Sequence, residues 1–114
     1  MAILTLKNLY CRDTEDWTGA DEPYLRVNNS TKWSGSLNTN QSVDLFNNKG
    51  QPLQINFTGQ AIISLWESDG NHWYDRDDFL GSWKVTNRDI GRGDQIAFFN
   101  LNGASYELAY EVTF

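Results

Sequence analysis

The sequence predicts an all-β protein, an antiparallel β-sandwich of about eight short strands. Three observations support this fold class. Apolar and polar residues alternate with a period of two, which places them on opposite faces of a strand. Asn- and Gly-rich turns separate the alternating runs, and no window of eleven or more residues has helical periodicity. The length of 114 residues suits a single domain spanning residues 1–114.

The expected strands are rich in Val, Ile, Phe and Trp, which favour the extended backbone. The clearest is the last, where Tyr106, Leu108 and Tyr110 alternate with more polar residues. In chain order, the expected strands are residues 3–10, 24–27, 43–46, 53–57, 61–66, 79–85, 96–101 and 106–114.

The expected turns contain residues that tolerate a positive φ angle. Residues 47–50 (Asn-Asn-Lys-Gly) form one of them, and residues 58–60 and 102–103 are predicted to be hairpin loops. Pro23 and Pro52 stand where a strand would begin, a position that tolerates the missing N–H.

Composition and charge exclude several classes of protein. An aromatic content of 14 % argues against disorder, and a net charge of −6 argues against nucleic acid as a partner. No apolar run is long enough to span a bilayer. The first ten residues lack the pattern of a secretory signal, so we expect a cytoplasmic location.

The sequence does not favour an enzyme. Cys11 is the only cysteine, which excludes an internal disulfide, and it is expected to be a small hydrophobe or a bystander next to Tyr10. His72 is the only histidine, so a Cys–His or Ser–His–Asp arrangement would have to include it. It lies in a Gly- and Asp-rich loop, and we therefore predict no catalytic residue.

Ten of the fifteen acidic side chains lie in two short windows, residues 13–22 and 67–78. They are Asp13, Glu15, Asp16, Asp21, Glu22, Glu67, Asp69, Asp75, Asp77 and Asp78. The rest of the chain has five acidic and eight basic residues. Each window falls between two expected strands, so an antiparallel topology can place both at one edge of the sandwich. The alternative is two separate, hydrated loops.

A hard divalent cation would relieve the repulsion between these carboxylates. Calcium is the first choice because it accepts six to eight oxygen ligands in irregular geometry, whereas magnesium requires a stricter octahedron. One Cys and one His cannot form a tetrahedral zinc site. The spacing of the acidic residues and the lack of flanking helices exclude an EF-hand.

The two acidic windows resemble the calcium loops of C2 domains. Residues 16–27, Asp-Trp-Thr-Gly-Ala-Asp-Glu-Pro-Tyr-Leu-Arg-Val, resemble the first loop. Residues 65–69, Leu-Trp-Glu-Ser-Asp, followed by residues 77–81, Asp-Asp-Phe-Leu-Gly, resemble the third loop. Because the loops and strands occur in the family's order, the resemblance covers most of the chain. It implies a C2-like Greek key and a Ca2+ site.

Carried over position by position, the resemblance makes Asp16 the first ligand of loop one, and Asp21 or Glu22 the second. In loop three, Glu67 and Asp69 match the paired ligands, although Asp is usual where Glu67 stands. Asp78 matches the last ligand. The predicted metal ligands are therefore Asp16, Asp21, Glu22, Glu67, Asp69, Asp75, Asp77 and Asp78.

The aromatic residues divide into two groups. Trp17, Trp73 and Tyr74 lie inside the acidic loops and are predicted to contact a partner. The other tryptophans, Trp33, Trp66 and Trp83, lie in or beside strands and are predicted to pack in the core.

We therefore predict a calcium-binding C2-like module that serves in calcium-dependent binding or sensing, with a membrane surface or a carbohydrate as the candidate partner. A calcium-dependent carbohydrate-binding sandwich is the alternative, and glycan binding without liposome binding would favour it. A glycosidase using two of the clustered carboxylates is a third, weaker hypothesis, because nothing in the sequence indicates a cleft. No Lys-rich run follows Val27, so any attachment to anionic lipid is expected to depend on calcium.

Overall fold

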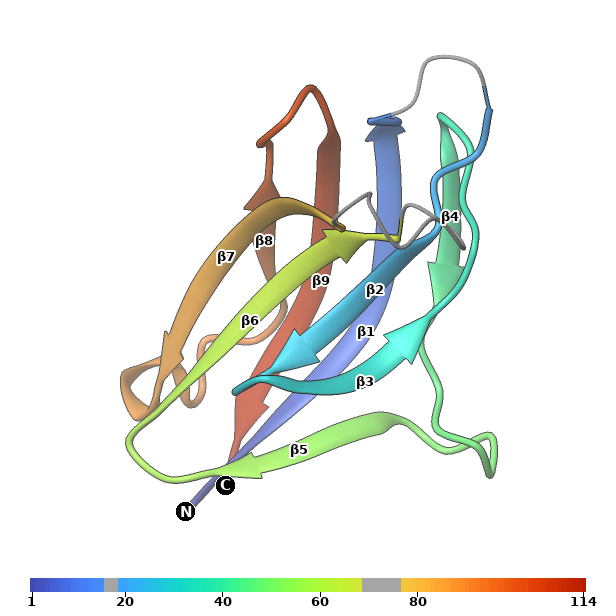
Figure 1. Ribbon diagram of the computed structural model, residues 1–114. Coiled ribbons are helices and arrows are strands. Elements are labelled where there is room, and N and C mark those ends of the chain that lie inside the picture. The colour runs from blue at the N-terminus through green and yellow to red at the C-terminus, as the bar shows by residue number, and fades with distance from the viewer. Residues whose placement is uncertain (16–18, 69–76) are drawn as a thin grey trace.

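The computed structural model describes residues 1–15, 19–68 and 77–114, which form two facing antiparallel sheets (Figure 1). The predicted antiparallel β-sandwich is confirmed. The described residues contain one 3-10 turn and nine strands: β1 (Ala2–Asp13), β2 (Pro23–Val27), β3 (Ser30–Ser34), β4 (Gln41–Asp44), β5 (Leu53–Phe57), β6 (Gln60–Glu67), β7 (Asp78–Thr86), η1 (Asn87–Asp89), β8 (Gln95–Phe99) and β9 (Ser105–Thr113).

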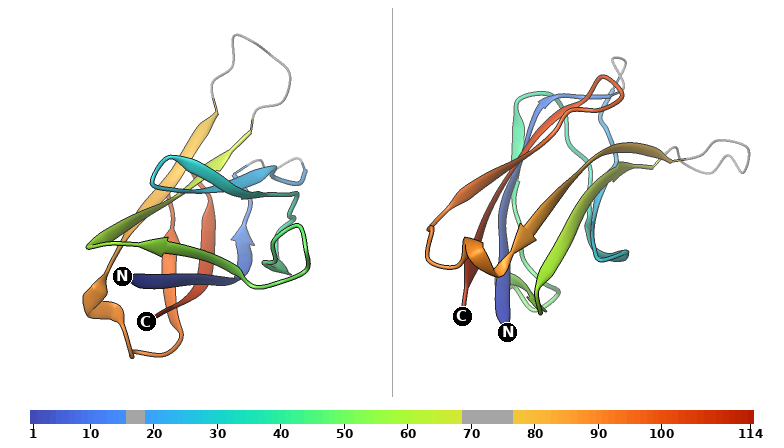
Figure 2. Two further views of the ribbon diagram at one scale, coloured as in Figure 1. Left: turned by 90° about the horizontal axis from the view of Figure 1, so that it is seen from below. Right: turned by 90° about the vertical axis from the view of Figure 1, so that its left-hand side faces the viewer.

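The first sheet has the order β4-β1-β9-β8, and the second has the order β3-β2-β6-β7. The long strand β1 pairs with β9 along one edge, while β5 and β4 pair in turn with its other edge. Ile3 pairs with Thr113, so the two ends of the chain lie side by side (Figure 2). From there β1 runs to the opposite end of the sandwich, where the first acidic window begins (Figure 1).

Two sequence-based expectations about strands and turns need correction. Strand β3 was not predicted because its sequence, Ser-Thr-Lys-Trp-Ser, has no apolar alternation and its side chains are mostly exposed. Residues 58–60 do not form a hairpin loop, since β5 pairs with β1 in the first sheet whereas β6 pairs with β2 and β7 in the second. Gly59 has the positive φ of a tight turn, but the turn carries the chain from one sheet to the other.

The hairpin predicted at residues 102–103 is confirmed. Asn102 and Gly103 have φ angles of 56° and 83°, and the strands on either side pair through Phe99 and Tyr106. Positive φ at both central residues matches the right-handed twist of the strands that a hairpin joins.

The core lies between the sheets, on their inward faces. Fully buried members include Leu4, Leu6, Leu9, Leu25, Ile63, Leu65, Leu80, Phe99, Tyr106 and Leu108. Cys11 is buried, and burial raises the pKa of its thiol. Trp33 and Trp83 pack against the core, but the core position predicted for Trp66 is wrong. Leu65 and Glu67 point inward, so the period of two turns Trp66 outward, against the Phe79 ring.

Gly81 lies where β7 comes close to β8. Its φ is +141°, and a Cβ atom there would lie 3.1 Å from the Cα of Phe99. A hydrogen bond from the Leu101 N–H to the Leu80 carbonyl, 3.0 Å long, ties this edge of the sandwich together. Because both backbones are held, neither can move aside for an added methyl group.

We expect Gly81→Ala to lower the free energy of unfolding by about 2–4 kcal/mol, from backbone strain and overpacking together. Gly50→Ala is the matched control: its φ is also positive, at +74°, but nothing lies within 4 Å of the added Cβ. It should cost only about 1 kcal/mol. Urea unfolding measures both, and equal losses would contradict the tight contact at Gly81.

Candidate metal centre

The two acidic windows meet at one end of the sandwich, as the antiparallel topology allows. Glu67 is the last residue of β6 and pairs with the first residues of both neighbouring strands, Pro23 of β2 and Asp78 of β7. Glu15 follows the end of β1 by two residues. Sheet pairing thus places Glu67, at the start of the second window, beside Pro23, the residue that follows the first window.

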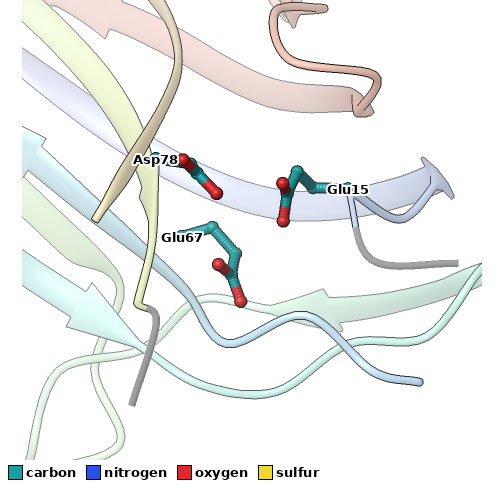
Figure 3. A group of neighbouring side chains, drawn as sticks. All are labelled: Glu15, Glu67 and Asp78. Carbon is teal, nitrogen blue, oxygen red and sulfur yellow. The ribbon is translucent and has the colours of Figure 1, made fainter. Parts of the chain in front are cut away.

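Three carboxylates converge at this end. One oxygen from each of Glu15, Glu67 and Asp78 lies within 4.8 Å of the other two. Figure 3 shows the three side chains directed toward one another from three separate segments. Glu67 is only 2 % exposed, while Glu15 and Asp78 are half-buried. Within the cluster, the Glu67 side chain is therefore buried, whereas the Glu15 and Asp78 side chains reach solvent.

Such proximity is electrostatically costly when all three groups are ionised. Two unit charges about 4.8 Å apart repel by on the order of 3 kcal/mol at an effective dielectric constant of about 20. A bound divalent cation would replace these repulsions with attractions. This cluster therefore suits a cation, and its all-oxygen donor set suits calcium better than zinc.

Backbone hydrogen bonds hold the two windows together around Glu67. The Glu22 N–H donates to Glu67 Oε1 at 3.3 Å, and the Ser68 N–H donates to the Glu22 carbonyl at 3.0 Å. Glu22 is exposed, and its backbone makes these contacts. Its predicted role as a ligand stays a prediction.

Asp21 lies beneath the cluster and is fully buried. Its Oδ2 accepts one hydrogen bond from the Glu15 N–H at 2.7 Å and another from the Tyr106 hydroxyl at 2.6 Å. The structure thus places Asp21 next to the three converging carboxylates but not among them. Burial, followed by the bond to Asp21, raises the pKa of Tyr106 well above its ordinary value.

Asp77 and Asp78 are adjacent, yet their carboxylates have different neighbours. Asp77 is exposed, and its Oδ2 accepts a hydrogen bond from the Tyr24 hydroxyl at 2.6 Å. Tyr24 lies between the buried residues Pro23 and Leu25, so it stands on the outer face of the second sheet. Burial and this hydrogen bond raise the pKa of Tyr24 to about 12. Asp78, in contrast, joins the cluster.

Of the predicted ligands, the structure brings Glu67 and Asp78 together and places Asp21, Glu22 and Asp77 around them. Asp16, Asp69 and Asp75 lie outside the described residues, as do the predicted partner contacts Trp17, Trp73 and Tyr74. The third member of the cluster, Glu15, was not among the predicted ligands. It belongs to the first acidic window, but the resemblance to the C2 loop selected its neighbour Asp16.

No protein-family model matches the sequence, and no curated protein matches it significantly. Several solved structures share its fold, among them two that contain C2 domains. One, described as a C2 domain, is 14 % identical with a TM-score of 0.61, and the alignment covers 100 % of both chains. The other holds the C2A and C2B domains of Extended-Synaptotagmin 2 and is 18 % identical with a TM-score of 0.57. That alignment covers 98 % of this chain and 39 % of the other. The chain therefore has the C2-like fold that its sequence predicts.

In the part of the chain that the structure describes, no helix has the length and apolar character needed to cross a membrane.

Proposed function

We propose that this protein is a calcium-binding C2-like module and that the converging carboxylates of Glu15, Glu67 and Asp78 form the centre of its Ca2+ site. The observation that carries the proposal is their convergence at the loop end of a C2-like sandwich. Glu67 supplies a buried anchor, and Glu15 and Asp78 close around the ion from two sides. Backbone carbonyls, water and further carboxylates of the acidic windows would complete the six to eight oxygen ligands.

Calcium would act here as an electrostatic switch. Without it, the loop end of the sandwich carries a concentrated negative charge that repels anionic surfaces. Each bound Ca2+ cancels two of these charges and draws the two acidic windows together. The module then presents a more neutral and more ordered loop end to its target. Our proposed target is an anionic membrane surface bridged by the metal.

A non-catalytic role agrees with the geometry of the cluster. A glycosidase needs two carboxylates on either side of a sugar, with room for the scissile bond between them. The cluster instead has three carboxylates, with one oxygen of each within 4.8 Å of the other two. We therefore infer that the acidic groups bind a metal and do not catalyse hydrolysis.

Calorimetric titration tests the proposal directly. We expect the protein to bind Ca2+ more tightly than Mg2+, and Asp78→Asn to weaken Ca2+ binding by about tenfold or more, because one charged ligand is lost. Asp44→Asn is the matched control, since Asp44 is exposed on β4 and accepts a hydrogen bond from the Asn8 side chain at 2.8 Å. No heat of Ca2+ binding, or an equal loss in both variants, would refute the site.

A further inference from the structure

A buried polar pair, Asp21 and Tyr106, links the core of the sandwich to the three-carboxylate cluster. Both side chains are fully buried. The Tyr106 hydroxyl donates to Asp21 Oδ2, and the same oxygen accepts the N–H of Glu15, whose side chain belongs to the cluster. The chain of contacts therefore runs from strand β9 through Asp21 to Glu15.

The core end of this chain of contacts is held firmly. Tyr106 lies on β9, where it pairs with Cys11 of β1 on one side and with Phe99 of β8 on the other. Its hydroxyl donates to Asp21 Oδ2 at 2.6 Å. The position of this donor is therefore set by the pairing of β9 with β1 and β8.

The backbone of Asp21 is held as well. Its N–H donates to the Leu37 carbonyl at 2.9 Å, and its own carbonyl accepts the Leu37 N–H at 3.0 Å. With the backbone and one carboxylate oxygen both tied, Asp21 presents a fixed acceptor to the segment that follows β1. This acceptor can therefore hold the Glu15 backbone in place through the hydrogen bond of 2.7 Å from the Glu15 N–H.

We propose that Asp21 and Tyr106 are positioning residues: acting through the N–H of Glu15, they set the place of the Glu15 carboxylate beside Glu67 and Asp78. This inference rests on the proposed function of the cluster as a cation site. It gives Asp21 a role that differs from the ligand role predicted from the sequence. Metal affinity depends on ligands that are already in place before the ion arrives, so the pair contributes to affinity without touching the metal.

The test removes one hydroxyl group and leaves every carboxylate intact. Tyr106→Phe deletes the donor to Asp21 while keeping the buried ring. Tyr110→Phe is the matched control, because Tyr110 is on the same strand, is 2 % exposed, and donates to Gln95 Oε1 at 2.8 Å on a different part of the sandwich. Tyr110 also accepts a hydrogen bond from Trp83 Nε1 at 3.0 Å, so Tyr110→Phe should lower stability at least as much as Tyr106→Phe.

Two measurements separate positioning from stability. In chelator, amide hydrogen exchange at Glu15 should accelerate about tenfold or more in Tyr106→Phe and stay near the parent rate in Tyr110→Phe. By calorimetry, the Ca2+ affinity of Tyr106→Phe should fall about 10–100-fold, the range seen when groups that orient metal ligands are lost. The affinity of Tyr110→Phe should stay within about twofold of the parent.

The outcomes distinguish this inference from the proposed function. If the parent binds Ca2+ and Tyr106→Phe changes neither Glu15 exchange nor affinity, the positioning role is wrong and the calcium site stands. Equal losses in both tyrosine variants would also overturn it, because general destabilisation would then explain them. If the parent fails to bind Ca2+ while Glu15 exchange responds as expected, the calcium site is wrong and the pair serves only the fold. Should Tyr106→Phe not fold, Asp21→Ala removes the acceptor of the Glu15 N–H, and an unchanged exchange rate at Glu15 then refutes the inference.

Discussion

Removing calcium should lower the melting temperature of this protein by on the order of 10 °C. An ion that binds the folded state and not the unfolded chain stabilises the fold by RT ln(1 + [L]/Kd), which is about 2.7 kcal/mol at a hundredfold excess over Kd. For a domain of this size, 1 kcal/mol corresponds to a shift in melting temperature of roughly 4 °C. The relief of repulsion between Glu15, Glu67 and Asp78 is already contained in that binding energy.

Thermal unfolding in millimolar calcium and in excess chelator measures this shift. Magnesium at the same ionic strength separates specific binding from general screening of charge. Asp78→Asn serves as the internal control, because a site weakened about tenfold keeps only about 1.4 kcal/mol of stabilisation at the same calcium concentration, so its shift should be roughly half that of the parent. If the parent protein has the same melting temperature in calcium and in chelator, its folded state has no calcium site.

Local pattern predicted most of the strands because each has one face in the core. In β9 the buried residues Tyr106, Leu108, Tyr110 and Val112 alternate strictly with less buried ones, as the sequence indicates. Strand β3 has no such face, since it forms the edge of the second sheet and only Trp33 is half-buried there. A strand held by backbone pairing alone leaves no periodic signal in its side chains.

The path of the chain between the sheets was harder to predict. A tight turn at residues 58–60 has the same local chemistry whether it joins paired strands or passes between two sheets. The difference lies in the partners of β5, which pairs with β1 about fifty residues earlier in the sequence. Only the packing of the whole sandwich decides that partner.

The residues of the candidate site were likewise predicted only in part from the sequence. Glu67 and Asp78 were predicted from the resemblance to the third C2 loop, and both stand at strand ends, where sheet register fixes their positions. Glu15 lies beyond the end of β1, and the resemblance to a C2 loop supplied no direction for its side chain. The place of Asp21 depends on Tyr106, which is 85 residues away along the chain, and a local motif carries no trace of that contact.

The largest effect of a single substitution on calcium affinity is expected at Glu67, and the sign of its effect on stability should depend on calcium. In chelator, Glu67→Gln removes the most buried charge of the cluster and should raise the free energy of unfolding by about 1–2 kcal/mol, as repulsion and desolvation are both relieved. The amide oxygen of Gln can still accept the Glu22 N–H, so the local fold is kept. In calcium the same change removes the buried ligand, and affinity should fall about a hundredfold or more.

The order of stability should therefore reverse between the two solutions. Glu67→Gln should be more stable than the parent in chelator and less stable than the parent in millimolar calcium. Glu111→Gln is the control of opposite sign, because Glu111 faces a cation, with its Oε1 3.0 Å from Lys7 Nζ. Neutralising it should cost up to about 1 kcal/mol in both solutions, as expected for an exposed ion pair. If Glu67→Gln instead destabilises the protein equally with and without calcium, Glu67 is a structural hydrogen-bonding residue and the metal is held elsewhere. If this order reverses for Glu67→Gln and not for Glu111→Gln, the buried carboxylate of Glu67 is a group that only a bound cation makes favourable.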